Sequence, residues 1–390
     1  MKKKQYISLQ VMVFSLVWAA FTTIYITQPV LPVLQVEFGV NESMASLSIS
    51  AVVLGIALAN LPFGILADRF PIRPIILTGG LVISACGLFC AITTNLLSLV
   101  LARFVQGLFI PSLTTCLAAY LARSLPMDRL NVVMGTYVSA TVAGGLSGRL
   151  LGGWIHPPLH WRYAFLSASV FLLIVTFAAA HWLKDDEKNI EPDTVQSMGF
   201  MALLSRGDML RIYFVAFGAF FVFSSIFNYL PFYLTGPPFN ASTNTITMLY
   251  LSYIVGIVVS PAAGELSNRI GNGASMVLGS LVLSLAIMAT LINSLVVVAI
   301  SLMGVCAGFF TIHSAAAGSL NRKLTSNRGH ANSLYILFYY IGGYVGITAS
   351  GFVYGYKGWT GVAVLGITIL LLPLTAGIVE MRHTTKDHQS

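Results

Sequence analysis

Three ionisable side chains, Arg103, Arg149 and His313, each lie inside a long run of apolar residues. Surrounding a charged side chain with hydrocarbon costs several kcal/mol, so such residues face a polar interior, a partner or a substrate. Arginine guanidinium groups bind carboxylate and phosphate groups, and histidine exchanges protons near neutral pH. The two arginines therefore favour an anionic, zwitterionic or neutral solute, and His313 is the first candidate for proton coupling.

Each of these residues also has a purely structural interpretation. Arg103 could pair with backbone carbonyl groups or a neighbouring helix, and His313 could bond to the hydroxyl of the adjacent Ser314. Glu37 is the second candidate for proton coupling, and it could equally be an exposed loop carboxylate. No predicted membrane span carries an acidic residue near its centre, which makes a strictly cationic solute a poorer candidate.

Amide and aromatic side chains occur in the same apolar runs and provide further candidates for the lining of a solute cavity. Core packing is the alternative for each of them singly, but their polar atoms together are difficult to bury without a water-filled cavity. With the two arginines, the predicted cavity residues are Gln28, Arg103, Gln106, Tyr137, Arg149, Asn228, Asn332, Tyr335 and Tyr339.

The composition of the 390-residue chain indicates which elements must position these residues. Charged residues are 9% of the chain, against roughly 25% in ordinary globular proteins. About 20 apolar residues cross a bilayer as a helix. The polar residues that separate the apolar segments then predict an all-α membrane protein with twelve transmembrane helices. The predicted spans are 9–34, 44–66, 74–93, 96–120, 131–155, 160–182, 209–234, 245–267, 274–293, 295–318, 331–355 and 359–381.

The distribution of lysine and arginine predicts the orientation of these spans. With a cytoplasmic N-terminus, 17 of the 21 basic residues fall on the cytoplasmic side and only Arg162 and Lys357 fall outside. Both termini are therefore expected in the cytoplasm. The bias also accounts for the net charge of +8 beside anionic lipid, so no nucleic-acid partner is expected.

The only long polar stretch divides the chain into two similar halves. We expect an N-terminal bundle of six helices over 1–183, a cytoplasmic linker over 184–208 and a C-terminal bundle of six helices over 209–390. Gly148 and Trp161 recur 198 residues later as Gly346 and Trp359. Parallel repeats of this kind are typical of transporters whose two bundles rock about a central site.

Two loop and helix motifs give the chain a resemblance to the major facilitator superfamily of transporters. The loop after the second span resembles the signature G-x-L-a-D-r-x-G-r-k through Gly64, Leu66, Asp68, Arg69 and Arg73, with Pro71 in place of a glycine. Arg103 to Gly107 resembles the family motif R-x-x-Q-G. The resemblance implies that Asp68, Arg69 and Arg73 form a cytoplasmic latch, and that Arg103 serves proton movement or substrate charge.

The fifth predicted span resembles the export-type signature G-x8-G-x3-G-P-x2-G-G, with Arg149 at the proline position. This departure and Trp161-Arg162 make the chain similar to the acriflavine-sensitivity subgroup of drug and sugar exporters. Small residues at these spacings permit close approach of helices, and we expect them at sliding surfaces between the bundles. The predicted helix-packing positions are Gly144, Gly148, Gly152, Gly256 and Gly346.

The resemblance implies a monomeric, multi-pass protein of the bacterial inner membrane that exports small organic solutes by alternating access, coupled to proton antiport. Drug-like molecules, sugars and organic anions are the expected substrates, with protons and lipid as the other partners. An importer or facilitator of an organic acid or sugar, and a lipid or glycolipid flippase, are the alternatives. The sequence has no phosphate-binding loop, metal-ligand cluster or nucleophile elbow, so we expect neither an enzyme nor a cofactor or metal.

Overall fold

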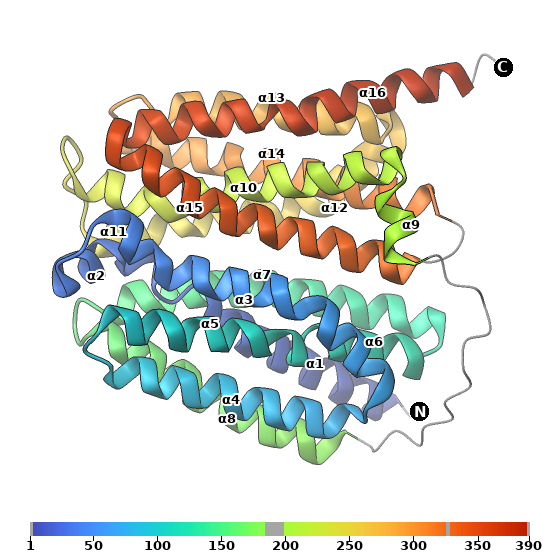
Figure 1. The fold of residues 1–390 in the computed structure, drawn as a ribbon, viewed down its shortest axis with the longest axis horizontal. Coiled ribbons are helices and arrows are strands. Elements are labelled where there is room, and N and C mark those ends of the chain that lie inside the picture. Colours follow the sequence, from blue (N-terminus) through green and yellow to red (C-terminus); the bar gives the residue numbers. More distant parts are fainter. Residues whose placement is uncertain (1–2, 184–198, 325–327, 388–390) are drawn as a thin grey trace. The chain divides into compact units, whose positions relative to one another are not determined.

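The computed structural model describes residues 3–183, 199–324 and 328–387, and these residues form helices and turns with no strand (Figure 1). Ten segments in this described part of the chain are long and apolar enough to cross a membrane. The chain divides into two compact units. Unit 1 is Met1–Pro192 with Ser242–Tyr250, and unit 2 is Asp193–Ala241 with Leu251–Ser390.

Unit 1 contains most of the N-terminal half and one short helix from further along the chain. Its elements are α1 (Lys3–Ile24), η1 (Gln28–Val30), α2 (Leu31–Phe38), α3 (Glu42–Arg69), α4 (Ile72–Ile92), α5 (Leu96–Leu113), α6 (Thr115–Ser124), α7 (Met127–Ile155), α8 (Trp161–Trp182) and α11 (Thr243–Leu249). The short helix α11 packs against α7 and η1, so a segment predicted to begin the eighth span belongs to the first unit.

Unit 2 contains the remaining helices. Its elements are α9 (Phe200–Leu204), α10 (Gly207–Thr235), α12 (Tyr253–Ile270), α13 (Asn272–Ala289), α14 (Leu295–Arg322), α15 (Arg328–Ile369) and α16 (Leu371–Asp387), with the 3-10 turn η2 (Tyr250–Ser252) at its boundary. Helix α15 is interrupted by the non-helical backbone of Gly358, where the sequence predicts the end of one span and the start of another. Most of the predicted linker 184–208 lies outside the described residues, and α9 falls in the rest of it.

Prolines explain why the first predicted span consists of three helical pieces. Pro29 and Pro32 lack the backbone N–H that an α-helix needs, so regular hydrogen bonding stops after Ile24. The chain continues through the 3-10 turn η1, where Gln28 donates its N–H to the Tyr25 carbonyl at 3.1 Å, and then through α2. The break leaves the last carbonyl groups of α1 without partners inside the helix.

Glycines bring α7 into direct contact with the backbone of α1 and of the turn that follows it. A Cβ at Gly144 would lie 2.5 Å from the Trp18 carbonyl oxygen, and Cβ atoms at Gly148 and Gly152 would overlap the carbonyl oxygens of Thr22 and Ile26. Any larger residue at these positions must therefore push the two helices apart. The indole of Trp18 adds a 2.8 Å hydrogen bond to Ser147 across the same contact.

Unit 2 repeats this packing between α15 and α10. A Cβ at Gly342 would overlap the Phe217 carbonyl oxygen, and one at Gly346 would overlap that of Phe221. Gly342 and Gly346 stand 198 residues after Gly144 and Gly148, so the sequence repeat corresponds to a repeated helix contact within each unit.

The glycines contact different partners from those the sequence predicts. We expected surfaces between the two bundles, but Gly144, Gly148 and Gly152 pack against a helix of their own unit, as does Gly346 in unit 2. A Cβ at Gly256 on α12 would overlap the ring of Phe310 on α14, also within unit 2. A small-residue stripe indicates close helix approach, and the pattern itself does not identify the partner helix.

Candidate functional site

Arg103 closes the broken end of α1. Its guanidinium donates to the carbonyl oxygens of Thr23, at 2.6 Å, and Ile24, while Nε donates to the Ser48 carbonyl of α3 at 3.0 Å. The side chain is completely buried. Thr23 and Ile24 are the last residues of α1, where unpaired carbonyls and the helix dipole favour a cation. Arg103 therefore adopts the backbone-pairing alternative that the sequence left open.

Gln106 stands one helical turn after Arg103 and extends the same network. Its Oε1 accepts from Arg103 at 2.8 Å, and its Nε2 donates to the Ile83 carbonyl of α4 at 2.9 Å. Residues three apart share a helix face, which explains why the spacing R-x-x-Q lets both side chains act together. The pair joins α1, α3, α4 and α5 inside unit 1.

Arg149 lies at the centre of a second cluster in unit 1. It is 2% exposed, and its Nε donates to Gln28 Oε1 at 2.6 Å while Nη1 donates to the Gly145 carbonyl at 2.6 Å. The guanidinium lies 3.8 Å from the ring centroid of Tyr25 and 5.6 Å from that of Tyr250. The amide hydrogen bond and the two aromatic rings together stabilise the buried charge of Arg149.

The sequence analysis did not include Tyr250 among the cavity residues. It lies 101 positions after Arg149 and reaches it because α11 packs on α7. Tyr137, which the sequence did identify, lies further along α7 and forms a hydrogen bond with Thr114 at the end of α5. Tyr137 and Arg149 therefore occupy different parts of α7.

His313 and two of the predicted tyrosines come together in unit 2. The Tyr335 hydroxyl of α15 lies 2.9 Å from Nδ1 of His313 on α14, and the ring of Tyr339 lies 5.3 Å from the imidazole. The sequence offered Ser314 as the structural partner of His313, but the Ser314 hydroxyl instead lies 3.4 Å from that of Ser260. Because the bond joins α14 to α15, it follows from tertiary packing and not from adjacency.

The predicted asparagines have other hydrogen-bond or packing neighbours in unit 2. Asn228 is fully buried on α10, beside Tyr229, whose hydroxyl donates to the Ile347 carbonyl at 2.9 Å. Asn332 on α15 donates to Asn321 Oδ1 of α14 at 3.3 Å. A role of Asn228 and Asn332 in solute binding stays a prediction.

Glu37 forms an ion pair and does not lie alone in a loop. One carboxylate oxygen accepts from Arg162 at 2.6 Å, and the other accepts from the indole N–H of Trp161 at 2.5 Å. Arg162 also donates to the Thr93 carbonyl at 2.8 Å, which ties the end of α2 to the end of α4 and the start of α8. Burial, and after it the charge of the neighbouring His160, lower the pKa of His156.

The predicted latch lies at the end of α3. Arg69 and Arg73 are exposed, and the side chain of Asp68 lies outside the described residues. Arg123, which the sequence analysis did not connect with this loop, donates to the Ala67 carbonyl at 2.9 Å. Nothing in the sequence around Arg123 predicts that contact, because a single basic residue near the end of a span has many possible partners.

Comparison with known proteins identifies the class of this helical membrane protein. The family model described as Major Facilitator Superfamily matches residues 13–316 and 238–387. The chain belongs to the Major Facilitator Superfamily. Its fold is accordingly that of a helical membrane transporter, and the chain is a multi-pass protein of the bacterial inner membrane.

Similar superfamily members extend over nearly the whole chain. The inner membrane transport protein YnfM of Escherichia coli K12 is 28% identical over 387 residues, covering 96% of this chain and 90% of that protein. An uncharacterized transporter of Buchnera aphidicola from Schizaphis graminum is 27% identical, covering 92% and 87% of the two chains.

A solved superfamily structure supports the fold independently. The crystal structure of a bacterial homolog of the human lysosomal transporter Spinster, described as inward-facing and unoccupied, matches with a TM-score of 0.80 and covers 99% of both chains. At 15% identity this likeness concerns the fold alone. Members of the superfamily are transporters, and this chain shares their architecture over its whole length.

Proposed function

We propose that this superfamily member is a monomeric secondary transporter that exports small organic solutes by alternating access in exchange for protons. The cluster of Arg149, Gln28, Tyr25 and Tyr250 carries the proposal, because it holds a guanidinium and an amide between aromatic rings within a membrane-spanning unit. Such a cluster suits flat solutes with a carboxylate or several hydroxyl groups, including organic anions, sugars and drug-like molecules.

The positions of the carboxylates support an anionic or neutral solute. In the described helices, Glu42 begins α3, Glu37 is paired at the end of α2, and Glu265 lies on the last turns of α12, where it pairs with Arg269. Glu380 of α16 pairs with Lys323 at 3.0 Å. Acidic groups that lie at helix ends or pair with a basic residue are poorly placed to neutralise a cation near the middle of a membrane.

We assign the two buried arginines different roles. Arg103 is a framework residue, since its donors serve the backbone carbonyls of α1 and α3. Arg149 contacts the solute, with Gln28 and the two tyrosines orienting its guanidinium. From the sequence, both arginines were candidates for the solute cavity, with backbone pairing left open as the alternative for Arg103.

Flux through purified protein in liposomes tests this function. Under an imposed pH gradient, we expect anionic and neutral aromatic or sugar-like solutes to exchange with protons, and permanently cationic solutes to move at least about tenfold more slowly, which corresponds to about 1.4 kcal/mol. Export of cations alone would contradict the proposal. Solute uptake with the proton gradient would indicate an importer, and scrambling of labelled lipid without solute flux would indicate a flippase.

We assign proton coupling to His313 with Tyr335. The 2.9 Å bond between the imidazole and the phenol links α14 to α15, so a change in the charge of His313 alters a contact between two helices of unit 2. Glu37 is the second candidate, and its pairing with Arg162 and Trp161 makes it the less mobile of the two. In the proposed cycle, Asp68, Arg69 and Arg73 at the end of α3 form the cytoplasmic latch, which opens and closes as the transporter changes state.

Replacing His313 with alanine is expected to uncouple transport from the proton gradient. Coupling free energies of about 1–3 kcal/mol predict at least a fivefold fall in gradient-driven flux, while solute exchange without a gradient continues. Tyr335→Phe should also reduce gradient-driven flux, but by less, because it removes only the hydroxyl that bonds to His313. Flux at several imposed pH gradients measures both effects.

His181→Ala provides the matched control, since this histidine is exposed at the end of α8. An unchanged gradient dependence in His313→Ala, with the control also unchanged, would remove His313 from the coupling mechanism. The same measurement on Glu37→Gln would then decide the second candidate.

A further inference from the structure

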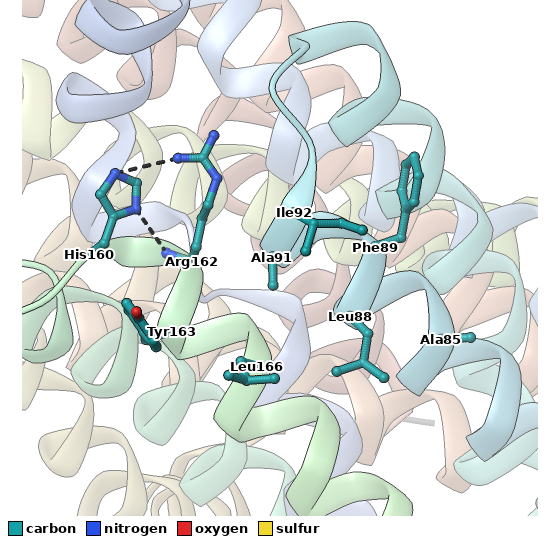
Figure 2. A pocket seen from close by; sticks show the side chains of 9 residues that line it. All are labelled: Ala85, Leu88, Phe89, Ala91, Ile92, His160, Arg162, Tyr163 and Leu166. Atoms are coloured by element: carbon teal, nitrogen blue, oxygen red, sulfur yellow. Dashed lines mark hydrogen bonds between the residues drawn. The ribbon is translucent and has the colours of Figure 1, made fainter.

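An apolar groove runs along the membrane-facing side of α4 and α8 in unit 1. It has a volume of about 850 Å³ and is lined on α4 by Leu88, Phe89 and Ile92 and on α8 by Tyr163 and Leu166. Figure 2 shows these side chains together with His160 and Arg162, which lie at one end of the groove. The groove is therefore hydrocarbon-like along most of its length and polar at one end only.

A second groove lies on the other flank of α4, against α5. Its volume is about 410 Å³, and it shares Ala85 and Phe89 with the first groove while adding Leu101 and Val105. The exposed ring of Phe89 thus separates two neighbouring apolar channels on one face of the unit. Two apolar grooves on either side of one side chain suit a lipid that carries two acyl chains.

The polar end carries charges of both signs. Arg162 and Glu37 form the 2.6 Å ion pair and are 22% and 28% exposed, so both remain within reach of a ligand at the surface. His160 lies 3.4 Å from Arg162 and 3.7 Å from Glu37. The carboxylate of Glu37 accepts from Trp161 and Arg162, and a carboxylate offers about four acceptor positions, so it retains capacity for another donor.

We propose that this site binds a glycerophospholipid whose zwitterionic head group ends in a primary ammonium. The phosphate lies against Arg162 and His160, the ammonium donates to Glu37, and the two acyl chains occupy the grooves on either side of Phe89. The surrounding solvent of these helices is lipid, which makes lipid the occupant that the apolar channels meet first. The site lies in the outer leaflet if both termini are cytoplasmic, and it is independent of the transported solute.

Charge complementarity distinguishes this lipid from the other abundant classes. An anionic head group without an ammonium would bring its negative charge near Glu37 and have no donor of its own for that carboxylate. A trimethylated ammonium has no N–H to donate, so Glu37 would lose a charge-assisted hydrogen bond. The paired arrangement of Arg162 and Glu37 matches a head group that itself carries one charge of each sign.

Native mass spectrometry of the purified protein tests the proposal. The protein is mixed with equal amounts of phosphatidylethanolamine, phosphatidylcholine and phosphatidylglycerol, and the lipids retained on the protein are counted. We expect phosphatidylethanolamine to be retained at least about tenfold over the other two, a ratio that corresponds to one charge-assisted hydrogen bond.

Two variants separate the head-group contact from the groove. Glu37→Gln should abolish the preference among head groups, and Ala85→Phe should reduce retention of all three lipids, because Ala85 lines both channels at an exposed position. Leu81→Phe, at an exposed position on α4 outside both channels, is the matched control and should bind as the unchanged protein does.

Three results would overturn the proposal. The first is equal retention of the three lipids by the unchanged protein, and the second is preferred retention of phosphatidylglycerol. The third is a phosphatidylethanolamine preference that survives Glu37→Gln, together with lipid retention that Ala85→Phe leaves unchanged. Because Ala85→Phe alters no buried contact, it keeps the test valid if Glu37→Gln weakens folding through the loss of its Arg162 pair.

Discussion

Replacing Arg103 with methionine is expected to prevent stable folding of unit 1. The substitution removes the donors that serve the carbonyl oxygens of Thr23, Ile24 and Ser48, all in a region where the arginine is completely buried. The Ser48 carbonyl lies inside α3, but the carbonyls of Thr23 and Ile24 are at the end of α1. Each buried acceptor left without a partner there costs about 1–3 kcal/mol, so the two together are a large part of the stability of an ordinary domain. The amount of protein that survives heating in detergent measures the effect.

The control for this prediction is Arg69→Met, which removes an exposed arginine from the end of α3 and should leave the melting temperature nearly unchanged. Arg103→Lys should recover only part of the stability, because an ammonium lacks the planar fork that reaches several carbonyls at once. If Arg103→Met has the same melting temperature as the unchanged protein yet fails to transport, Arg103 belongs to the solute site.

The second large effect is expected from Arg149→Gln, and it concerns transport more than stability. The Gly145 carbonyl that Arg149 contacts also lies in a helix, and glutamine can still bond to Gln28, so little is left unsatisfied. Loss of the guanidinium should reduce flux of anionic solutes by about tenfold to a hundredfold, the value of a charge-assisted hydrogen bond. Neutral solutes should be affected much less.

Flux of anionic and neutral solutes through the same liposome preparations measures this change in selectivity. Arg149→Lys retains the charge and should keep part of the anion flux, which separates charge from shape. An equal fall for both classes of solute would mean that Arg149 only packs α7 against α1 and η1. A melting temperature as low as that of Arg103→Met would lead to the same conclusion.

The contrast between the two arginines shows how far a motif in the sequence can be interpreted. Each lies in an apolar run, and the sequence correctly indicated that each needs a polar environment. The polar environment of Arg103 is the end of α1. Pro29 and Pro32 stop that helix at the residues whose carbonyl oxygens the Arg103 guanidinium reaches. Neither residue type nor spacing reveals that the two features meet.

The glycine stripes give a similar lesson. Spacing of four predicts a flat helix face, and the Cβ positions at Gly148 and Gly346 confirm close backbone contact. The partner helices, α1 and α10, come from the same units as the glycines, whereas the sequence predicted partners in the opposite bundle. The spacing of glycines in the sequence predicts how closely another helix can approach, but it does not predict which helix that is.

The sequence by itself determined that the chain is an all-helical membrane protein with repeated halves, and its motifs indicated the superfamily. Those properties depend on the length and apolarity of each segment and on local spacing, which are written along the chain. The tertiary structure decided which polar groups meet: Arg103 with α1, Arg149 with Tyr250, His313 with Tyr335, and Glu37 with Trp161. The reason is that these contacts join segments from 22 to 124 residues apart, and their geometry follows from how whole helices pack.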